Sequence, residues 1–265
     1  MNVELSLLSD WLSSNKLLLN VDKTKHILFC TKAKESLLYK NKFILNIKNA
    51  MVSQVREFNF LGVVFQENLS WKTHAYGVWQ KIRGQYGAIK KISKNLCEHS
   101  LNILYHSFLL SHVKYCIPVW YHGQENIFTQ IQNLCDKFTR LTYKIKKDMP
   151  LVNTAKTHMI LSVKDLYMCE VTSIMHNNVT NILPPCFSQF FTQNCNVHDF
   201  YTRSKYKFHI PQYTKAVSQQ SLRYVGSKCW QSVPLAITST IHTVSKHCFM
   251  KNVKKHLISQ YYNHH

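Results

Sequence analysis

Residues 55–74, VREFNFLGVVFQENLSWKTH, constrain the fold more than any other stretch of this sequence. The apolar run at 58–65 is rich in aromatic and β-branched residues, which predicts a buried strand. Glu67 and Asn68 then predict a turn, and Ser70 can cap a following helix. We therefore expect a change at this point from a mixed segment of strands and helix to a helical segment.

The segment before this stretch predicts a small sheet. Residues 2–16 place Leu5, Leu8, Trp11 and Leu12 on one face of a helix. Short apolar runs predict strands at 26–31, 43–47 and 51–55, with a polar loop at 32–42 and a hairpin turn at Asn49 and Ala50. With 58–65, they predict a small antiparallel sheet covered on one face by a helix, which is too small to be an independent domain.

The segment after it predicts helices. Residues 72–95 carry an apolar stripe at helical spacing, formed by Ala75, Val78, Ile82, Tyr86, Ile89 and Ile92. Further helices are expected at about 98–111, 113–121, 125–144, 153–156, 161–177, 218–231 and 244–261. The segment KIKKDMP at 144–150 predicts a basic connector, and residues 186–216 predict a loop with short strands. The expected fold class is therefore α+β.

The charge of the chain indicates its partner. There are 33 Lys and Arg residues against 13 Asp and Glu residues, which gives a formal net charge of +20. Residues 200–265 contain ten Lys or Arg residues and no carboxylate. Because such charge destabilises a compact state without a polyanion, RNA or DNA is the expected partner. A solvated basic face or a lysine-rich composition is the alternative explanation.

The cysteines and the hydropathy indicate the compartment. The nine cysteines are scattered without a CxxC pair, which favours free thiols in a reducing environment over a disulfide framework or a zinc ribbon. The N-terminus has no basic segment of a signal peptide, and no apolar run approaches the ~20 residues that span a bilayer. We expect an intracellular protein, cytoplasmic or nuclear and not secreted, with no membrane partner.

No catalytic constellation is visible. Metal-dependent phosphoryl transfer needs clustered carboxylates, but the sequence contains no DD, DxD or ExD, and its closest acidic pair is Asp165 and Glu170. Cys186, Cys195 and His198 lack a fourth ligand at a diagnostic spacing for zinc. We therefore expect no catalytic residue, no metal site, no cofactor and no small-molecule substrate.

Basic residues interleaved with aromatic residues provide the candidate binding surface. On the helix at 72–95 they are Lys72, Trp79, Lys81, Arg83, Tyr86, Lys90 and Lys91, and in the later loop they are Tyr201, Arg203, Lys205, Tyr206 and Lys207. Such interleaving suits stacking on bases and contact with phosphates. On the helix, the alternative is that Trp79 and Tyr86 lie in the core and only the cations are exposed.

An ordered set of segments resembles one protein family. SDWLSSNKLLLNVDKTKHILF, VREFNFLGVVFQENLSWKTH and LYHSFLLSHVKYCIPVW are similar to the end of the palm and the thumb of a LINE-type, jockey-like non-LTR retrotransposon reverse transcriptase. ILPPCFSQFF, YTRSKY, SLRYVGSKCWQSVP and FMKNVKKHL resemble its C-terminal region. The resemblance covers nearly the whole chain and implies a palm remnant at 1–69, a helical thumb at 70–148 and a basic C-terminal region at 149–265.

The resemblance assigns roles to individual residues. Lys23 matches the motif D lysine, which assists proton transfer to pyrophosphate, and Phe60, Leu61 and Gly62 match the primer grip. The helix at 72–95 corresponds to a thumb helix that lies along the minor groove of a primer–template duplex. The alternatives are a turn lysine for Lys23 and ordinary strand core for Phe60 and Leu61.

The departure from the family is equally informative. The YxDD-type carboxylate pair that binds Mg²⁺ in the family has no counterpart here, so Mg²⁺ is expected only for a full-length parent enzyme. We expect Met1 to be an internal methionine of a longer reading frame. The leading hypothesis is an RNA-directed DNA polymerase fragment that is inactive alone and binds nucleic acid. The alternatives are a co-opted RNA- or DNA-binding module and a helical scaffold that binds protein.

Overall fold

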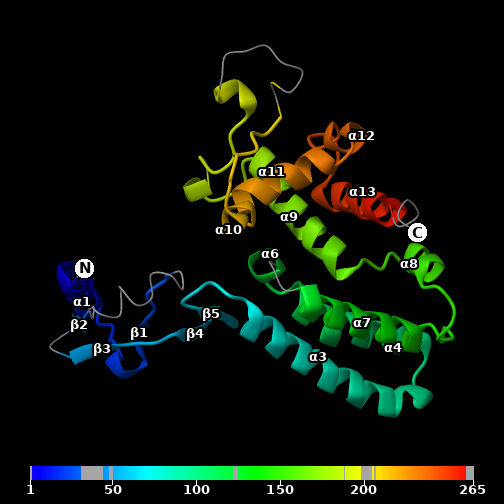
Figure 1. Ribbon diagram of the computed structural model, residues 1–265, viewed down its shortest axis with the longest axis horizontal. Helices are drawn as coiled ribbons and strands as arrows, with labels where there is room; N and C mark the ends of the chain where they lie inside the picture. Colours follow the sequence, from blue (N-terminus) through cyan, green and yellow to red (C-terminus); the bar gives the residue numbers. More distant parts are fainter. Residues whose placement is uncertain are drawn as a thin grey trace. The chain divides into compact units, whose positions relative to one another are not determined.

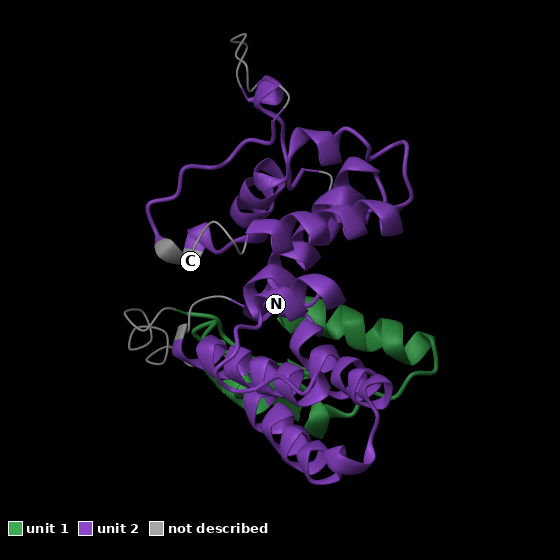
Figure 2. Cartoon of the chain, turned by 90° about the vertical axis from the view of Figure 1, so that its right-hand side faces the viewer, with its two compact units in different colours: residues 1–77 green, residues 78–265 purple. Residues whose placement is uncertain are grey.

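The computed structural model describes residues 2–30, 44–47, 50–121, 125–187, 189–197, 205 and 207–260. The chain divides into two compact units, unit 1 at residues 1–77 and unit 2 at residues 78–265 (Figure 2). The three-part division at 69 and 148 remains a prediction. Helices and small sheets occur together in the described residues, as expected for the α+β class.

Unit 1 combines a helix with short strands. Its elements are α1 (Asn2–Ser14), the 3-10 turn η1 (Val21–Lys23), β1 (Lys25–His26), β2 (Leu45–Ile47), β3 (Ala50–Gln54), β4 (Glu57–Phe60) and β5 (Val63–Gln66) (Figure 1). Strands β2 and β3 form the predicted antiparallel hairpin, in which Leu45 lies opposite Val52. The predicted strand at 26–31 is shorter than expected, and the predicted loop at 32–42 lies outside the described residues.

Two expectations for this sheet are wrong. Strand β1 pairs with β3 in parallel, with Lys25 opposite Ser53, so the three-stranded sheet in the order β1-β3-β2 is mixed rather than antiparallel. Residues 58–65 form a hairpin and not one buried strand, because the chain reverses at Leu61 and Gly62. Both residues have positive φ, 49° and 81°, which a tight type I′ turn requires. The sequence does not predict this turn, because a bulky residue such as Leu61 rarely adopts that conformation.

Helix α1 packs on β2, and the Asn2 side chain brackets the strand. Asn2 Nδ2 donates to the Ile44 carbonyl and Asn2 Oδ1 accepts from the Asn46 amide, each at 3.2 Å. The buried face of the helix is centred on Ser9, which is 4% exposed, while Leu8 and Trp11 are exposed. The predicted apolar face is therefore only partly correct.

Unit 2 is helical. Its helices include α3 (Lys72–Ile92), which begins in unit 1, then α4 (Glu98–Leu104), a π-helical segment η3 (Tyr105–Leu110), α5 (Ser111–Lys114), α6 (Ile117–Trp120), α7 (Glu125–Thr142), α8 (Val152–His158), α9 (Val163–Val179), α10 (Ala216–Gln219), α11 (Leu222–Ser232), α12 (Leu235–Thr238) and α13 (Lys246–Ser259). Short 3-10 turns occur at η2 (Ser93–Asn95), η4 (Pro185–Phe187) and η5 (Asn194–Asn196). These bounds confirm most of the predicted helices.

The core of unit 2 has two parts. In the first, α7 lies beside α3 and α4, and Phe138 packs against Tyr86 and Tyr105 with ring centroids 6.0 and 5.5 Å apart (Figure 1). In the second, α9 packs against α11 and α13 around Met175. A Cβ at Gly226 would come within 2.8 Å of the sulfur of Met175, so only glycine permits this approach of α11.

Candidate nucleic-acid interface

Helix α3 carries several exposed cations and no carboxylate. Its sequence, KTHAYGVWQKIRGQYGAIKKI, contains no Asp or Glu, and Lys72, Lys81, Arg83, Lys90 and Lys91 are all exposed. Lys72 belongs to unit 1 and the other four belong to unit 2. Phosphate groups are the ligands that such a surface favours.

The apolar stripe on the opposite side of α3 fixes which side chains face solvent. Ala75, Ile82 and Ile89 are buried at a spacing of seven residues, which is two helical turns. Val78 and Tyr86 are half-buried, as an edge of the stripe should be. Ile92 is 51% exposed, so its predicted place in the stripe is wrong: the α-helix ends at this residue, and the chain continues as a 3-10 turn.

The two aromatic residues of this helix have different environments. Tyr86 packs against Phe138 in the core. Trp79 is half-buried, and the guanidinium carbon of Arg83 lies 5.1 Å from the centroid of its ring. This is a cation–π contact, which orients Arg83 along the helix surface. The expectation of stacking residues is therefore unsupported for Tyr86.

Two glycines on the exposed side of α3 were not recognised from the sequence. Gly84 and Gly87 are three residues apart, and nothing lies within 4 Å of a Cβ built on either. Glycine inside a helix costs about 0.5–1 kcal/mol relative to alanine. No packing in the described structure requires these glycines, so at Gly84, which is exposed, and at Gly87, which is half-buried, the backbone has no side chain that would stand between it and a ligand. Their spacing on the face opposite Ile82 and Ile89 could have revealed them.

The hairpin tip of unit 1 carries Phe60, Leu61 and Gly62. Phe60 is 56% exposed and Leu61 is 75% exposed, which excludes the interpretation that they are ordinary strand core. The Leu61 conformation, with φ of 49°, costs of order 1–2 kcal/mol for a residue other than glycine. Strained residues of this kind are concentrated at functional sites.

The other predicted binding residues lie on different elements. Lys23 is exposed at the end of η1, where its amide donates to Asn20 Oδ1 at 3.0 Å. Lys205 and Lys207 accept hydrogen bonds at their carbonyls from the amides of Cys195 and Asn194. Lys207 is exposed and Lys205 half-buried, and Phe208, the next residue, enters the core. Arg203 lies outside the described residues.

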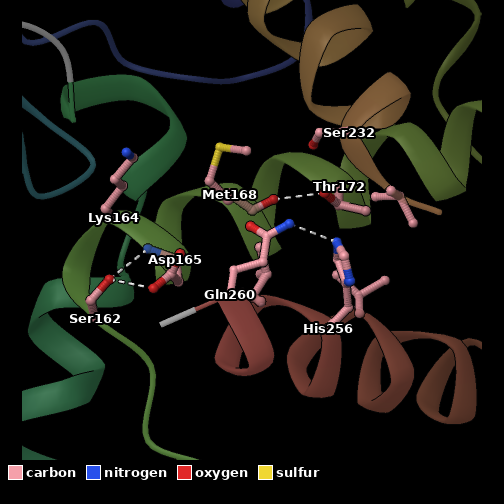
Figure 3. A pocket seen from close by; sticks show the side chains of 11 residues that line it. Ser162, Lys164, Asp165, Met168, Thr172, Ser232, His256 and Gln260 are labelled. Carbon is pink, nitrogen blue, oxygen red and sulfur yellow. Dashed lines mark hydrogen bonds between the residues drawn. The ribbon is translucent and has the colours of Figure 1, made fainter. Parts of the chain in front are cut away.

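A pocket of about 280 Å³ lies between α9, α13 and the end of α11 (Figure 3). Ser162 Oγ donates to Asp165 Oδ2 at 2.5 Å and accepts from the Asp165 amide at 3.1 Å. Gln260 Nε2 lies 3.0 Å from His256 Nε2. These groups bond with one another at helix ends, and Ser162 serves as the N-cap of α9. The pocket can hydrogen-bond a small polar group, but its geometry indicates no reaction.

Three cysteines, Cys135, Cys169 and Cys229, are buried, and the other six are half-buried or exposed. Burial raises the pKa of Cys135 and Cys229 to about 12, so these thiols stay protonated at neutral pH. Burial lowers the pKa of His176, and the neighbouring Lys246 acts in the same direction. No group of three metal-ligating side chains occurs in the described ranges. Within those ranges, each helix is also too short or too polar to cross a membrane.

Comparison with models of protein families, with curated proteins and with solved structures gives no match to the chain.

Proposed function

We propose that the chain binds the phosphate backbone of a nucleic acid along α3. One observation supports this proposal above the others: Lys81, Arg83, Lys90 and Lys91 surround a backbone left open at Gly84 and Gly87, on a helix without carboxylates. Cations hold phosphates without reading sequence, and bare backbone lets a groove approach closely. We further propose that this surface derives from the thumb of a retrotransposon reverse transcriptase, with residues 1–69 as a palm remnant.

The test is fluorescence anisotropy of a labelled RNA–DNA hybrid, with the triple variant R83E/K90E/K91E. Four phosphate contacts on α3 should contribute about −3.6 to the slope of log affinity against log salt. The variant should bind at least ~100-fold more weakly, because it removes three contacts and repels phosphate. The matched control is K215E/K251E/K255E, which changes the net charge equally at exposed positions away from α3. Equal losses in the two variants would show that only net charge matters.

A glycine variant tests whether the open backbone contributes to binding in addition to the charge. Replacing both Gly84 and Gly87 with alanine should stabilise the helix by about 1–2 kcal/mol. It should nevertheless weaken binding, because the added methyl groups stand where the ligand approaches. Unchanged affinity in this variant would leave only charge as the basis for binding.

The resemblance proposes an enzyme fragment that cannot polymerise DNA alone. Purified protein with Mg²⁺, a primer and a template should therefore extend no primer. Extension that a chelator abolishes would contradict this proposal.

A protein-binding scaffold is the second candidate, because unit 2 exposes apolar side chains along residues 98–120. Ile103, Phe108, Tyr115 and Val119 are 40–53% exposed. Aromatic and aliphatic side chains of this kind are typical anchors at protein interfaces. Tight association with a protein after nuclease treatment would favour this function over the first.

A further inference from the structure

The loop that follows α7 is basic and closely fastened to the helix. It comprises residues 143–149, here named the braced loop, and it exposes Lys144, Lys146 and Lys147 within four positions. From sequence alone it was only a connector. Its conformation is instead defined by hydrogen bonds at both ends and by a residue, Lys144, with φ of 51°.

Arg140 closes this loop. Its Nη1 donates to the carbonyl of Lys146 at 2.7 Å and to the carbonyl of Met149 at 2.6 Å. The Ile145 amide also donates to the Arg140 carbonyl at 3.0 Å. The guanidinium therefore neutralises carbonyl dipoles inside the loop and adds a positive charge beneath it. A loop fixed in this way loses little conformational entropy when it binds a ligand.

The lysines of the braced loop face solvent without acidic partners. Among the described residues, Lys144, Lys146 and Lys147 form no ion pair, and Asp148 is the one carboxylate within the loop. Since three neighbouring cations repel one another, the arrangement gains from an anion with several charges.

The braced loop is attached to α4, the helix that follows α3 in the chain. Tyr143 Oη donates to Asn102 Oδ1 at 3.2 Å, which ties the start of the loop to α4. Helix α4 begins six residues after Ile92, so this contact fastens the loop to the helix that follows α3. Lys90 and Lys91 are exposed in the last turn of α3, and Lys94 is exposed in the 3-10 turn η2 after it. Figure 1 shows the connection from α7 to α8 on the same side of unit 2 as this end of α3.

We propose that the braced loop is a second phosphate-binding site, which contacts the backbone of the nucleic acid that lies along α3. The inference rests on the proposed function, because α3 supplies the first contact. A nucleic-acid backbone fits better than an anionic lipid surface, because the exposed cations occur on two elements, α3 and the braced loop, and a strand presents phosphates at regular intervals that two separate elements can contact.

The experiment uses the full chain and a labelled RNA–DNA hybrid of about 24 base pairs, at salt concentrations from about 50 to 200 mM. The variant K144Q/K146Q/K147Q should bind about 10-fold or more weakly at the low salt concentration, and its salt slope should be smaller by about 2–3. A second variant, R140K, tests the bracing: it keeps the charge but cannot bridge two carbonyls in the same geometry. It should bind about 3-fold more weakly with an unchanged slope.

The outcomes separate this inference from the proposed function. If R83E/K90E/K91E loses affinity while the loop variant binds with the wild-type affinity and slope, the inference is wrong and the α3 site stands. If the wild-type chain binds no nucleic acid, both are wrong. If K144Q/K146Q/K147Q loses binding to phosphatidylserine vesicles but binds the hybrid as the wild type does, the inference is overturned in favour of a membrane surface. Wild-type affinity in R140K would overturn the role of Arg140, and melting curves check that each variant is folded.

Discussion

Unit 1 and unit 2 bury their hydrophobic side chains to very different degrees. Among the described residues of unit 1 the buried apolar side chains are Ile47, Val52, Val63 and Ala75, whereas Val3, Leu7, Trp11, Leu18, Met51 and Leu61 are 58–98% exposed. In unit 2 the large side chains of Trp120, Phe138 and Phe249 are fully buried. The described part of unit 1 therefore has a much smaller core for its length.

The physical reason lies in the elements that are available for packing. A single helix can cover only one face of a two- or three-stranded sheet, so side chains on the other face stay in water. Helices can surround a core from several sides, as α3, α4 and α7 do around Phe138. We therefore expect unit 2 to supply most of the stability of the chain, and unit 1 to open at lower free energy.

The largest expected effect contrasts two phenylalanines. Phe138→Ala should destabilise unit 2 by about 3–5 kcal/mol, because it empties a fully buried site. Phe58→Ala in β4 should cost less than about 1 kcal/mol, since that side chain is 39% exposed. Denaturant unfolding measures both changes. Similar losses would show that unit 1 has a core comparable to that of unit 2.

The next contrast uses pH. Burial lowers the pKa of His74 in unit 1 and of His176 in unit 2 below that of an exposed histidine. The unfolded chain therefore binds protons before the folded chain does. The free energy of unfolding should therefore not depend on these histidines above about pH 6.5, the pKa of an exposed histidine. It should decrease as the pH falls toward the folded pKa, by up to about 1.4 kcal/mol per pH unit for each histidine.

The two histidines differ in their partners. His74 Nδ1 accepts from the Val64 amide at 3.3 Å, whereas neither ring nitrogen of His176 has a hydrogen-bond partner among the described residues. His176→Leu should therefore reduce the pH dependence with little loss of stability at neutral pH. Unfolding curves at about pH 5 and 7.5 test this, and an unchanged pH dependence would assign the effect to other groups.

The hairpin tip offers a gain of stability in the weaker unit. Leu61→Gly should stabilise the β4–β5 hairpin by about 0.5–1 kcal/mol. Glycine removes the strain of a leucine in the left-handed conformation, and this gain exceeds the greater loss of backbone entropy that glycine brings on folding. Gly62→Ala should act in the opposite direction, since φ at this position is 81°. Amide hydrogen exchange at β4 and β5 reports both changes. A loss of protection in Leu61→Gly would mean that the leucine side chain stabilises the tip.

The smallest expected effect concerns surface ion pairs. Lys114 and Glu170 lie 3.0 Å apart in unit 2, and Arg56 and Glu67 lie 3.9 Å apart in unit 1. Glu170→Gln should cost about 0.2–1 kcal/mol, because both side chains are about one-third exposed and the pair is screened by salt. Thermal melts at low and high salt should show the difference only at low salt.

The predictability of the elements followed their periodicity. The helix at 72–95 and those at 125–144, 161–177 and 244–261 were recognised because apolar residues recur on one face over several turns. The hairpin at 57–66 was missed, because Leu61 stands where Asn or Gly would mark a type I′ turn. The parallel pairing of β1 with β3 was missed because local pattern does not determine which strand lies beside which.

Some features of the candidate site could be predicted from the sequence and others could not. The exposure of Lys81, Arg83, Lys90 and Lys91 follows from the position of the buried stripe, so sequence was sufficient to predict it. The partners of Trp79 and Tyr86 could not be predicted, because their positions at the edge of the stripe are compatible with either core or surface. The openness at Gly84 and Gly87 also depends on what packs nearby.

The sequence by itself determined the helical character of unit 2, the excess of positive charge and the absence of paired carboxylates, because these are properties of residue type and local spacing. Only the tertiary structure decided that Leu61 and Gly62 form an exposed tip, and that Arg140 closes a basic loop by binding the carbonyls of Lys146 and Met149. Such features depend on backbone conformation and on contacts between neighbouring segments. Those contacts depend on how the whole core packs, and a local sequence pattern does not specify that packing.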